Sequence, residues 1–249
     1  VPTPADRRRA IDAALAAPYT QQGLRLDYTT YFGQSMTAGL QRVVVSLVAE
    51  LPVLPEAGGV GSSRESGADV VFVVKDVKTS RVAASGTEHI ALPARTEGGF
   101  STGTSTWHIA FDLPAGEYIM RCVVREPGGV VGSADRRFVV RQLGGFDVAA
   151  SDLVLASPGD PFPVRARAYT ESALTGTARL YARTADKLQQ VTGQLDLVPL
   201  GETGTPPATG RGAAPEFGPV IESLSGARRD VLVSLPLSGL SPGPYVAKL

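Results

Sequence analysis

A short phrase occurs twice in this 249-residue chain, with leucine, glycine and tyrosine at the same spacing. The two copies are Leu113, Gly116 and Tyr118, and Leu240, Gly243 and Tyr245. A leucine that ends an inward-facing strand, a glycine at the reversal and a tyrosine that opens the next strand form the pattern of a tyrosine corner. The tyrosines are therefore expected to hold structural corners. Two such corners predict two β-sandwiches in series.

Alternation of apolar and polar residues supports this interpretation. Between residues 118 and 125, Tyr118, Met120, Cys122 and Val124 alternate with more polar neighbours, and "EPGG" then predicts a turn. Similar strand patterns occur at 24–32, 42–51, 69–77, 105–113, 136–141, 151–157, 164–170, 177–184, 193–200 and 228–237. Strands separated by Gly/Pro turns predict an all-β fold of two tandem immunoglobulin-like β-sandwich domains.

The segment "PADRRRAIDAALAAP" is the one stretch with helical spacing. Asp6 is expected to cap its start and Pro18 to end it. The expected organisation is a short helix and lead-in at 1–22, a first sandwich at 23–143 and a second at 144–249. Glycine, proline and threonine without periodicity from residue 201 predict a long mobile loop over 201–226.

The second copy of the phrase is cut short. After Tyr118 the chain continues through a full hairpin to Arg141, whereas after Tyr245 it reaches only Leu249. A sandwich without its last strand has an open edge. We therefore expect the second domain to be C-terminally incomplete. Either the chain is truncated relative to its gene, or another segment or a neighbouring molecule fills the gap by strand exchange.

Charge and hydropathy exclude several classes. The chain has 24 Lys+Arg and 24 Asp+Glu, so no cationic surplus supports nucleic-acid binding. No apolar run approaches the roughly 20 residues that span a bilayer, and the polar start "VPTPADRRRA" lacks the apolar core of a signal peptide. Cys122 is the only cysteine, which excludes an intramolecular disulfide. On the inward strand face it is expected to behave as a small hydrophobe.

One motif raises the possibility of catalysis. "GFSTG" matches Gly-x-Ser-x-Gly, with Ser101 as the nucleophile of a serine hydrolase. That chemistry needs a strand, a turn and a helix, but a strand pattern follows this motif. His108 lies on that strand and should point away from the face of Trp107 and Ile109. We therefore expect no catalytic residue, and a hydrolase remains a distant alternative.

Metal and cofactor sites are not predicted. His89 and His108 are the only histidines, and neither occurs at a ligand spacing such as His-Glu-x-x-His. Loop carboxylates such as Asp160 or Glu171 leave calcium open, although no Asp-x-Asp-x-Asp-Gly loop supports it.

Carbohydrate binding is the principal alternative function. Trp107 could stack on a sugar ring, but its apolar neighbours two residues away favour a core position. A row of exposed aromatics would favour sugar binding, whereas burial of Trp107, Tyr31 and Phe72 would count against it.

The order of several phrases resembles a known family. "RRRAIDAALAAPYTQQGLRLDYTTYFG", "FDLPAGEYIMRCVVREPGGVVGSADRRFVV" and "ASDLVLAS" together resemble the region after the von Willebrand factor A (VWA) domain in bacterial VWA-related proteins, over residues 5–155. The resemblance implies a secreted or envelope-associated, non-enzymatic module that contacts a protein partner or neighbouring domains. The chain lacks the Asp-x-Ser-x-Ser motif of the A domain, so metal-dependent adhesion is not implied.

Overall fold

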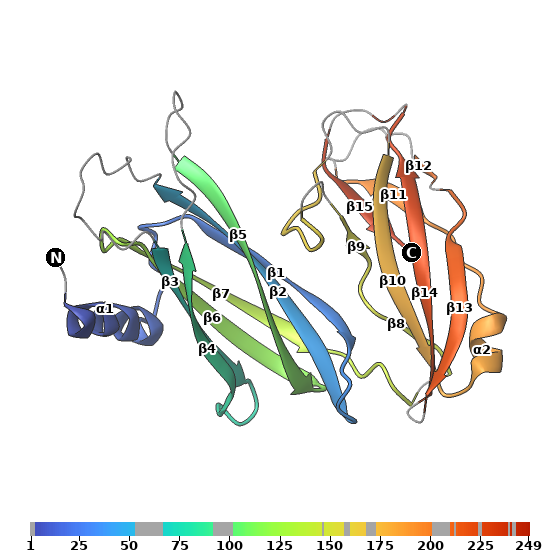
Figure 1. Cartoon of the computed structure of the whole chain (residues 1–249), viewed down its shortest axis with the longest axis horizontal. Coiled ribbons are helices and arrows are strands. Elements are labelled where there is room, and N and C mark those ends of the chain that lie inside the picture. The colour runs from blue at the N-terminus through green and yellow to red at the C-terminus, as the bar shows by residue number, and fades with distance from the viewer. Residues whose placement is uncertain are drawn as a thin grey trace. The chain divides into compact units, whose positions relative to one another are not determined.

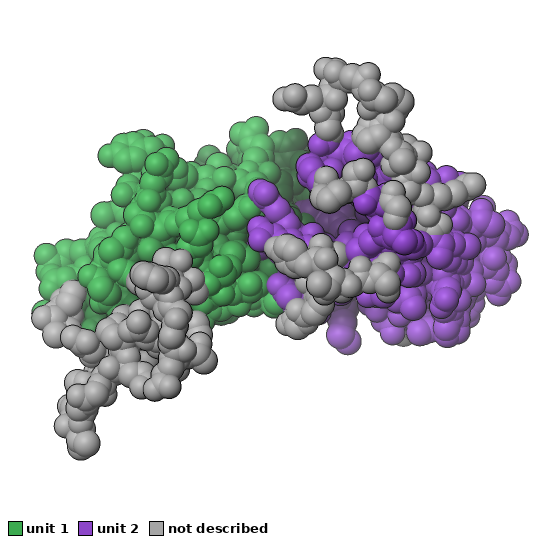
Figure 2. Space-filling view, turned by 90° about the horizontal axis from the view of Figure 1, so that it is seen from above, with its two compact units in different colours: residues 1–30, 44–140 green, residues 31–43, 141–249 purple. Residues whose placement is uncertain are grey.

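The chain forms two compact units. The computed structural model describes residues 3–52, 67–91, 102–145, 147–156, 160–167, 173–200, 210–211, 213–223, 226–238, 240 and 243–249. Unit 1 comprises Val1–Thr30 and Val44–Val140, and unit 2 comprises Tyr31–Val43 and Arg141–Leu249 (Figure 2). The division near residue 141 lies close to the expected one, but the assignment of residues 31–43 to unit 2 is not visible in the sequence.

Unit 1 is a β-sandwich with one sheet of three strands and one of four (Figure 1). The first sheet has the order β1 (Leu26–Gln34), β2 (Leu40–Pro52) and β5 (Thr102–Pro114), and the connected ends of β1 and β2, residues 31–34 and 40–43, belong to unit 2. The second has the order β4 (Val82–Ala91), β3 (Gly67–Asp76), β6 (Gly116–Arg125) and β7 (Val131–Val140), and its neighbouring strands are antiparallel. The polar strand β4 was not predicted, because Ser, Gly, Thr and His interrupt its apolar pattern.

Period-two alternation builds the core of unit 1, as predicted. On β6, Tyr118, Met120, Cys122 and Val124 are each at most 2% exposed. The other sheet contributes Val45, Leu47, Trp107, Ile109 and Leu113, all of them buried. Burying a large apolar side chain stabilises a fold by roughly 1.5–3 kcal/mol. The inward faces predicted from the sequence are therefore the faces that hold this unit together.

Helix α1 (Pro4–Ala16) precedes the strands and begins two residues before Asp6, the residue expected to cap it. Thr3 is the N-cap: its side chain accepts from the Asp6 backbone N–H, while the Asp6 carboxylate accepts from the Thr3 N–H. The expected cap at Asp6 was wrong because Pro4, with its fixed φ, already starts the helix. Asp6 instead completes a capping box, and its hydrogen bonds with Thr3 lower its pKa.

Unit 2 is also a β-sandwich. One sheet has the order β13 (Glu216–Ser223), β14 (Gly226–Pro236), β10 (Ala173–Ala182) and β8 (Ala149–Ala150), with β9 (Val154–Leu155) also paired to β10. The other has the order β12 (Gly210–Arg211), β11 (Asp196–Pro199) and β15 (Tyr245–Lys248). Buried side chains from both sheets form its core, among them Leu180, Leu197, Val231, Val233 and Leu235.

Three expectations for the second half were wrong. A short helix, α2 (Ala185–Gln189), follows β10 where only strands were expected, and its Leu188 is fully buried in the core. Strands β12 and β13 fall inside the expected loop 201–226, of which residues 201–209, 212 and 224–225 lie outside the described residues. Pro219 hid β13 in the sequence, but an edge strand with a bulge tolerates proline. Residues 164–167 are irregular rather than a strand.

Where β1 and β2 meet, backbone groups of β1 form hydrogen bonds with other residues of unit 2. The Phe32 N–H donates to the Asp152 carboxylate at 3.0 Å, and the Asp152 N–H donates back to the Phe32 carbonyl. The Gln34 N–H donates to the Tyr181 hydroxyl at 3.0 Å. Burial raises the pKa of Asp152, although Arg141 pairs with its carboxylate. Among the described residues, neither helix is long and apolar enough to cross a lipid bilayer.

Candidate functional site

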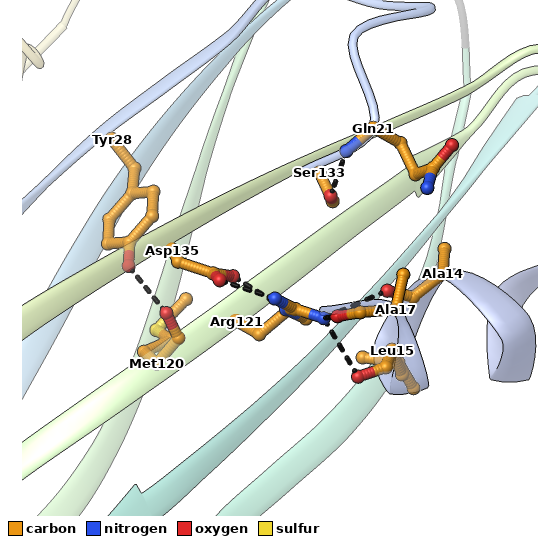
Figure 3. A network of polar contacts seen from close by, with 9 residues as sticks. All are labelled: Ala14, Leu15, Ala17, Gln21, Tyr28, Met120, Arg121, Ser133 and Asp135. Carbon is orange, nitrogen blue, oxygen red and sulfur yellow. Dashed lines mark hydrogen bonds and ion pairs between the residues drawn. The ribbon is translucent and has the colours of Figure 1, made fainter. Parts of the chain in front are cut away.

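Arg121 is the centre of a polar network on the outer face of unit 1 (Figure 3). Its Nε donates to the Asp135 carboxylate at 2.6 Å, and its Nη2 donates to the second carboxylate oxygen. Its Nη1 donates to the backbone carbonyls of Ala14 and Leu15, at 3.3 and 3.1 Å, and to that of Ala17. The bond with Asp135 raises the pKa of Arg121. The arginine thus joins two strands to the end of a helix.

Strand register and helix polarity explain this arrangement. Arg121 on β6 lies directly opposite Asp135 on β7, so their side chains share one face of the sheet. The last carbonyls of a helix lack intrahelical donors and carry a partial negative charge. Because α1 has no basic residue in its own last turn, Arg121 supplies the cation from the sheet.

A second contact secures the segment after α1. The Gln21 N–H donates to the Ser133 hydroxyl at 2.7 Å, and the Ser133 N–H donates to the Gln21 carbonyl at 2.9 Å (Figure 3). Gln22 also forms a β-bridge with Gly132. A Cβ atom on Gly132 would lie 2.6 Å from the Leu24 carbonyl oxygen, so this close approach requires glycine. The lead-in therefore runs along the start of β7.

Two grooves flank this network. The first, of about 530 Å³, is lined by apolar Leu15, Val73 and Ile119, with Lys75 and Asp135 among its charged residues. The second, of about 510 Å³, is lined by the lead-in and β7 and includes Asp27, Ser133, Asp135 and Arg136. Asp135 borders both grooves. The first groove combines an apolar lining with charged groups, an arrangement suited to contact with another polypeptide.

The residues considered for catalysis are not brought together in the described part of the chain. Ser101 lies outside the described residues. His108 is exposed on β5, on the opposite face from the buried Trp107, as expected from the alternation. His89 on β4 lies 2.9 Å from the Asp69 carboxylate, directly across the strand pair.

In the described part of the chain, neither the candidate metal ligands nor the one thiol forms a reactive site. No group of three or more His, Cys, Asp or Glu residues is placed to hold a metal among the described residues. Asp160 accepts from the Phe162 N–H at 2.9 Å, while Glu171 lies outside the described residues. Burial raises the pKa of the Cys122 thiol to about 12. A thiol that stays protonated and shielded is unreactive.

The first corner is held by its tyrosine. The Tyr118 hydroxyl donates to the Pro114 carbonyl at 3.0 Å, four residues upstream. Leu113 is 1% exposed, and a Cβ on Gly116 would touch the Tyr118 ring. Burial raises the pKa of Tyr118, so the hydroxyl stays protonated and continues to donate.

The leucine and tyrosine of the second corner are less buried than those of the first. Leu240 and Tyr245 are half-buried against the core of unit 2, and Gly243 is exposed. Tyr245 opens β15, as Tyr118 lies near the start of β6.

Most of the aromatic side chains considered for sugar binding face the core. Trp107 is 9% exposed and Phe72 is 6% exposed, stacked on Phe111 at 5.4 Å between ring centroids. Tyr31 is half-buried, and its hydroxyl donates to the Pro163 carbonyl. In the described part of the chain, Tyr19 is the one aromatic residue among the exposed large hydrophobic side chains.

The polar network around Arg121 was missed by sequence reasoning because it depends on the register of β6 and β7. No known protein family matches the sequence, and no curated protein is similar enough to count as a relative.

Proposed function

We propose that this chain is a non-catalytic β-sandwich module that contacts a protein partner, within a larger secreted or envelope-associated bacterial protein related to the VWA family. The observation that carries the proposal is the first groove beside α1. Leu15, Val73 and Ile119 give it apolar area, and Ile119 is 38% exposed. Lys75 and Asp135 add charges of both signs. Protein interfaces combine an apolar centre with a polar rim in this way.

The burial of Trp107 and Phe72 counts against the carbohydrate-binding alternative. Sugar-binding surfaces need aromatic faces that a sugar ring can reach. Several described polar side chains with catalytic potential make structural contacts, among them Arg121, Asp135 and Tyr118. These positions favour a binding role over chemistry.

Site-specific photo-crosslinking tests the proposal. The photoreactive amino acid p-benzoylphenylalanine replaces Ile119 in the groove, and in a matched control it replaces Leu232, which is 47% exposed on β14. Each variant is irradiated with secreted and envelope fractions of the organism that makes the protein.

We expect a discrete protein adduct with the Ile119 variant that excess unlabelled chain competes away. Identical adducts from both variants would contradict the proposal. Retardation of the chain in gels containing polysaccharide would favour sugar binding. Ester hydrolysis that is lost in Ser101→Ala would favour a hydrolase.

A further inference from the structure

Helix α1 is held on the sheet of unit 1 by little buried surface. It packs against β6 and β7, but Ala14 is the one buried residue of its thirteen. Arg7, Ala10, Ile11 and Leu15 are half-buried, and the rest of the helix is exposed. A helix that belongs to a core normally buries a continuous apolar stripe. The packing of α1 therefore stabilises its position far less than the packing of β6 does, where four consecutive inward side chains are buried.

Arg121 supplies the directional contacts that this packing lacks. Its guanidinium group donates to the carbonyls of Ala14, Leu15 and Ala17, which all lie at the C-terminal end of α1 (Figure 3). The pairing of β6 with β7 places Asp135 beside the same guanidinium group, so its orientation does not depend on the helix. One preoriented side chain therefore acts on one end of α1, as a latch would.

A short exposed connection joins α1 to the fixed part of the lead-in. Residues 18–20 are exposed, and Tyr19 is 70% exposed. The chain is fixed again at Gln21, which exchanges two hydrogen bonds with Ser133. A few connecting residues between two rigid parts can absorb the dihedral changes of a hinge. Movement of α1 therefore requires no change in the sandwich itself.

We propose that α1 is a strap: it opens from β6 and β7 as one unit while the sandwich of unit 1 stays folded, and Arg121 latches it closed. Isolated helices shorter than about 12–15 residues are marginally stable in water, and α1 has 13 residues. An opened α1 therefore loses most of its helical hydrogen bonds. Its amide protons exchange in the open state, whereas those of the strands do not.

The strap controls the first groove, because the end of α1 forms one of its walls. That wall consists of Asp12, Leu15, Ala16 and Ala17, and the opposite wall includes Val73 and Ile119 of the sheet. The groove therefore exists only while α1 is closed. A partner that binds there binds the closed state alone, and its apparent affinity falls with the closed fraction. This regulation of the groove rests on the proposed function, whereas the opening of α1 does not.

Amide hydrogen exchange of the whole chain in low concentrations of urea tests the opening. We expect the amides of residues 10–16 to share one protection factor, at least about tenfold below that of the β6 amides. It should change little with urea, because opening the strap exposes little surface. Equal protection and equal urea dependence in α1 and β6 would overturn the inference. Protection that rises steadily along α1 would overturn it as well, because the helix would then fray from its end.

Substitutions at the latch and under the helix sharpen the test. Arg121→Met should lower the shared protection factor of α1 at least about fivefold, whereas Arg137→Met, exposed on the same sheet face, should leave it within about twofold. Ala14→Asp places an unpaired carboxylate at the buried position and should abolish the protection of α1 while β6 stays protected. Ala13→Asp, at the exposed neighbouring position, is its matched control and should lower protection no more than about fivefold.

Crosslinking from Ile119 tests the control of the groove. Adding Ala14→Asp to the photoreactive Ile119 variant should abolish its protein adduct, and adding Ala13→Asp should preserve it. An adduct that survives Ala14→Asp would overturn the control of the groove, and loss of β6 protection in that variant would overturn the strap itself. If the photoreactive Ile119 variant forms no adduct even with α1 intact, the proposed function fails, and hydrogen exchange alone still decides whether α1 opens.

Discussion

Replacing Arg121 by methionine tests the network that holds α1. The substitution removes a cation from the helix C-terminus, worth about 0.3–1 kcal/mol and up to about 2 kcal/mol when partly buried. It also removes the pair with Asp135, in which the arginine and aspartate side chains are 16% and 27% exposed. An ion pair with this much solvent access contributes at most about 1 kcal/mol. The expected loss in the free energy of unfolding is therefore about 1–3 kcal/mol.

The order of the losses distinguishes the two contributions. Asp135→Asn leaves Arg121 on the helix carbonyls and should cost at most about 1 kcal/mol. The double variant should be little less stable than Arg121→Met alone, because the two residues share one interaction. Arg137→Met, on the same sheet face and exposed, is the matched control and should change stability by no more than about 0.5 kcal/mol.

Two assays measure these effects. Urea unfolding gives the change in free energy. Limited trypsin digestion reports helix release, because α1 carries three consecutive arginines at positions 7–9. Arg121→Met should speed cleavage there, whereas Arg137→Met should not. If Arg121→Met matches Arg137→Met in both assays, the network does not hold the helix.

Three further substitutions test other buried or closely packed positions in unit 1. Burial raises the pKa of the Cys122 thiol from 9.0 to about 12, so the protonated thiol favours the folded state fully below pH 9.0 and progressively less as the pH rises toward 12. Between neutral pH and about pH 11, the free energy of unfolding should therefore fall by about 2–3 kcal/mol more in the wild type than in Cys122→Ala, as measured by urea unfolding across pH. Tyr118→Phe removes the hydroxyl that holds the first corner and should lower stability by about 1 kcal/mol, and an unchanged urea midpoint would contradict that role. Gly132→Ala places a Cβ 2.6 Å from the Leu24 carbonyl oxygen and should cost more than about 1 kcal/mol in thermal unfolding. Gly243→Ala, whose Cβ would have no atom of the described residues within 4 Å, is the control.

The sequence predicted those features that local patterns determine. Apolar alternation identified β6 and its inward Cys122, and the spacing of glycine and tyrosine identified the corner that Tyr118 holds. Local patterns failed where tertiary contacts compensate for unfavourable residues. Pro219 is tolerated in β13 because that strand lies at a sheet edge, and the short helix α2 is anchored by the buried Leu188.

The features that define the candidate site depend on register rather than on composition. Arg121 meets Asp135 only because β6 and β7 pair in one particular alignment. Likewise, the assignment of residues 31–43 to unit 2 depends on contacts such as that between Phe32 and Asp152. In both pairs the two residues are far apart in the sequence, so no local pattern predicts that they meet.

Residue-resolved amide hydrogen exchange tests the strand pairing on which the account rests: among the described strands, β15 pairs with β11 on one side, whereas β6 pairs with β3 and β7 on both sides. In the monomeric chain, the amides of Val246 and Lys248 should be protected and that of Ala247 should exchange freely. On β6, the adjacent amides of Ile119 and Met120 should both be protected, because strands pair with each side. Protection of Ala247 equal to that of Val246 in the monomer would contradict this account.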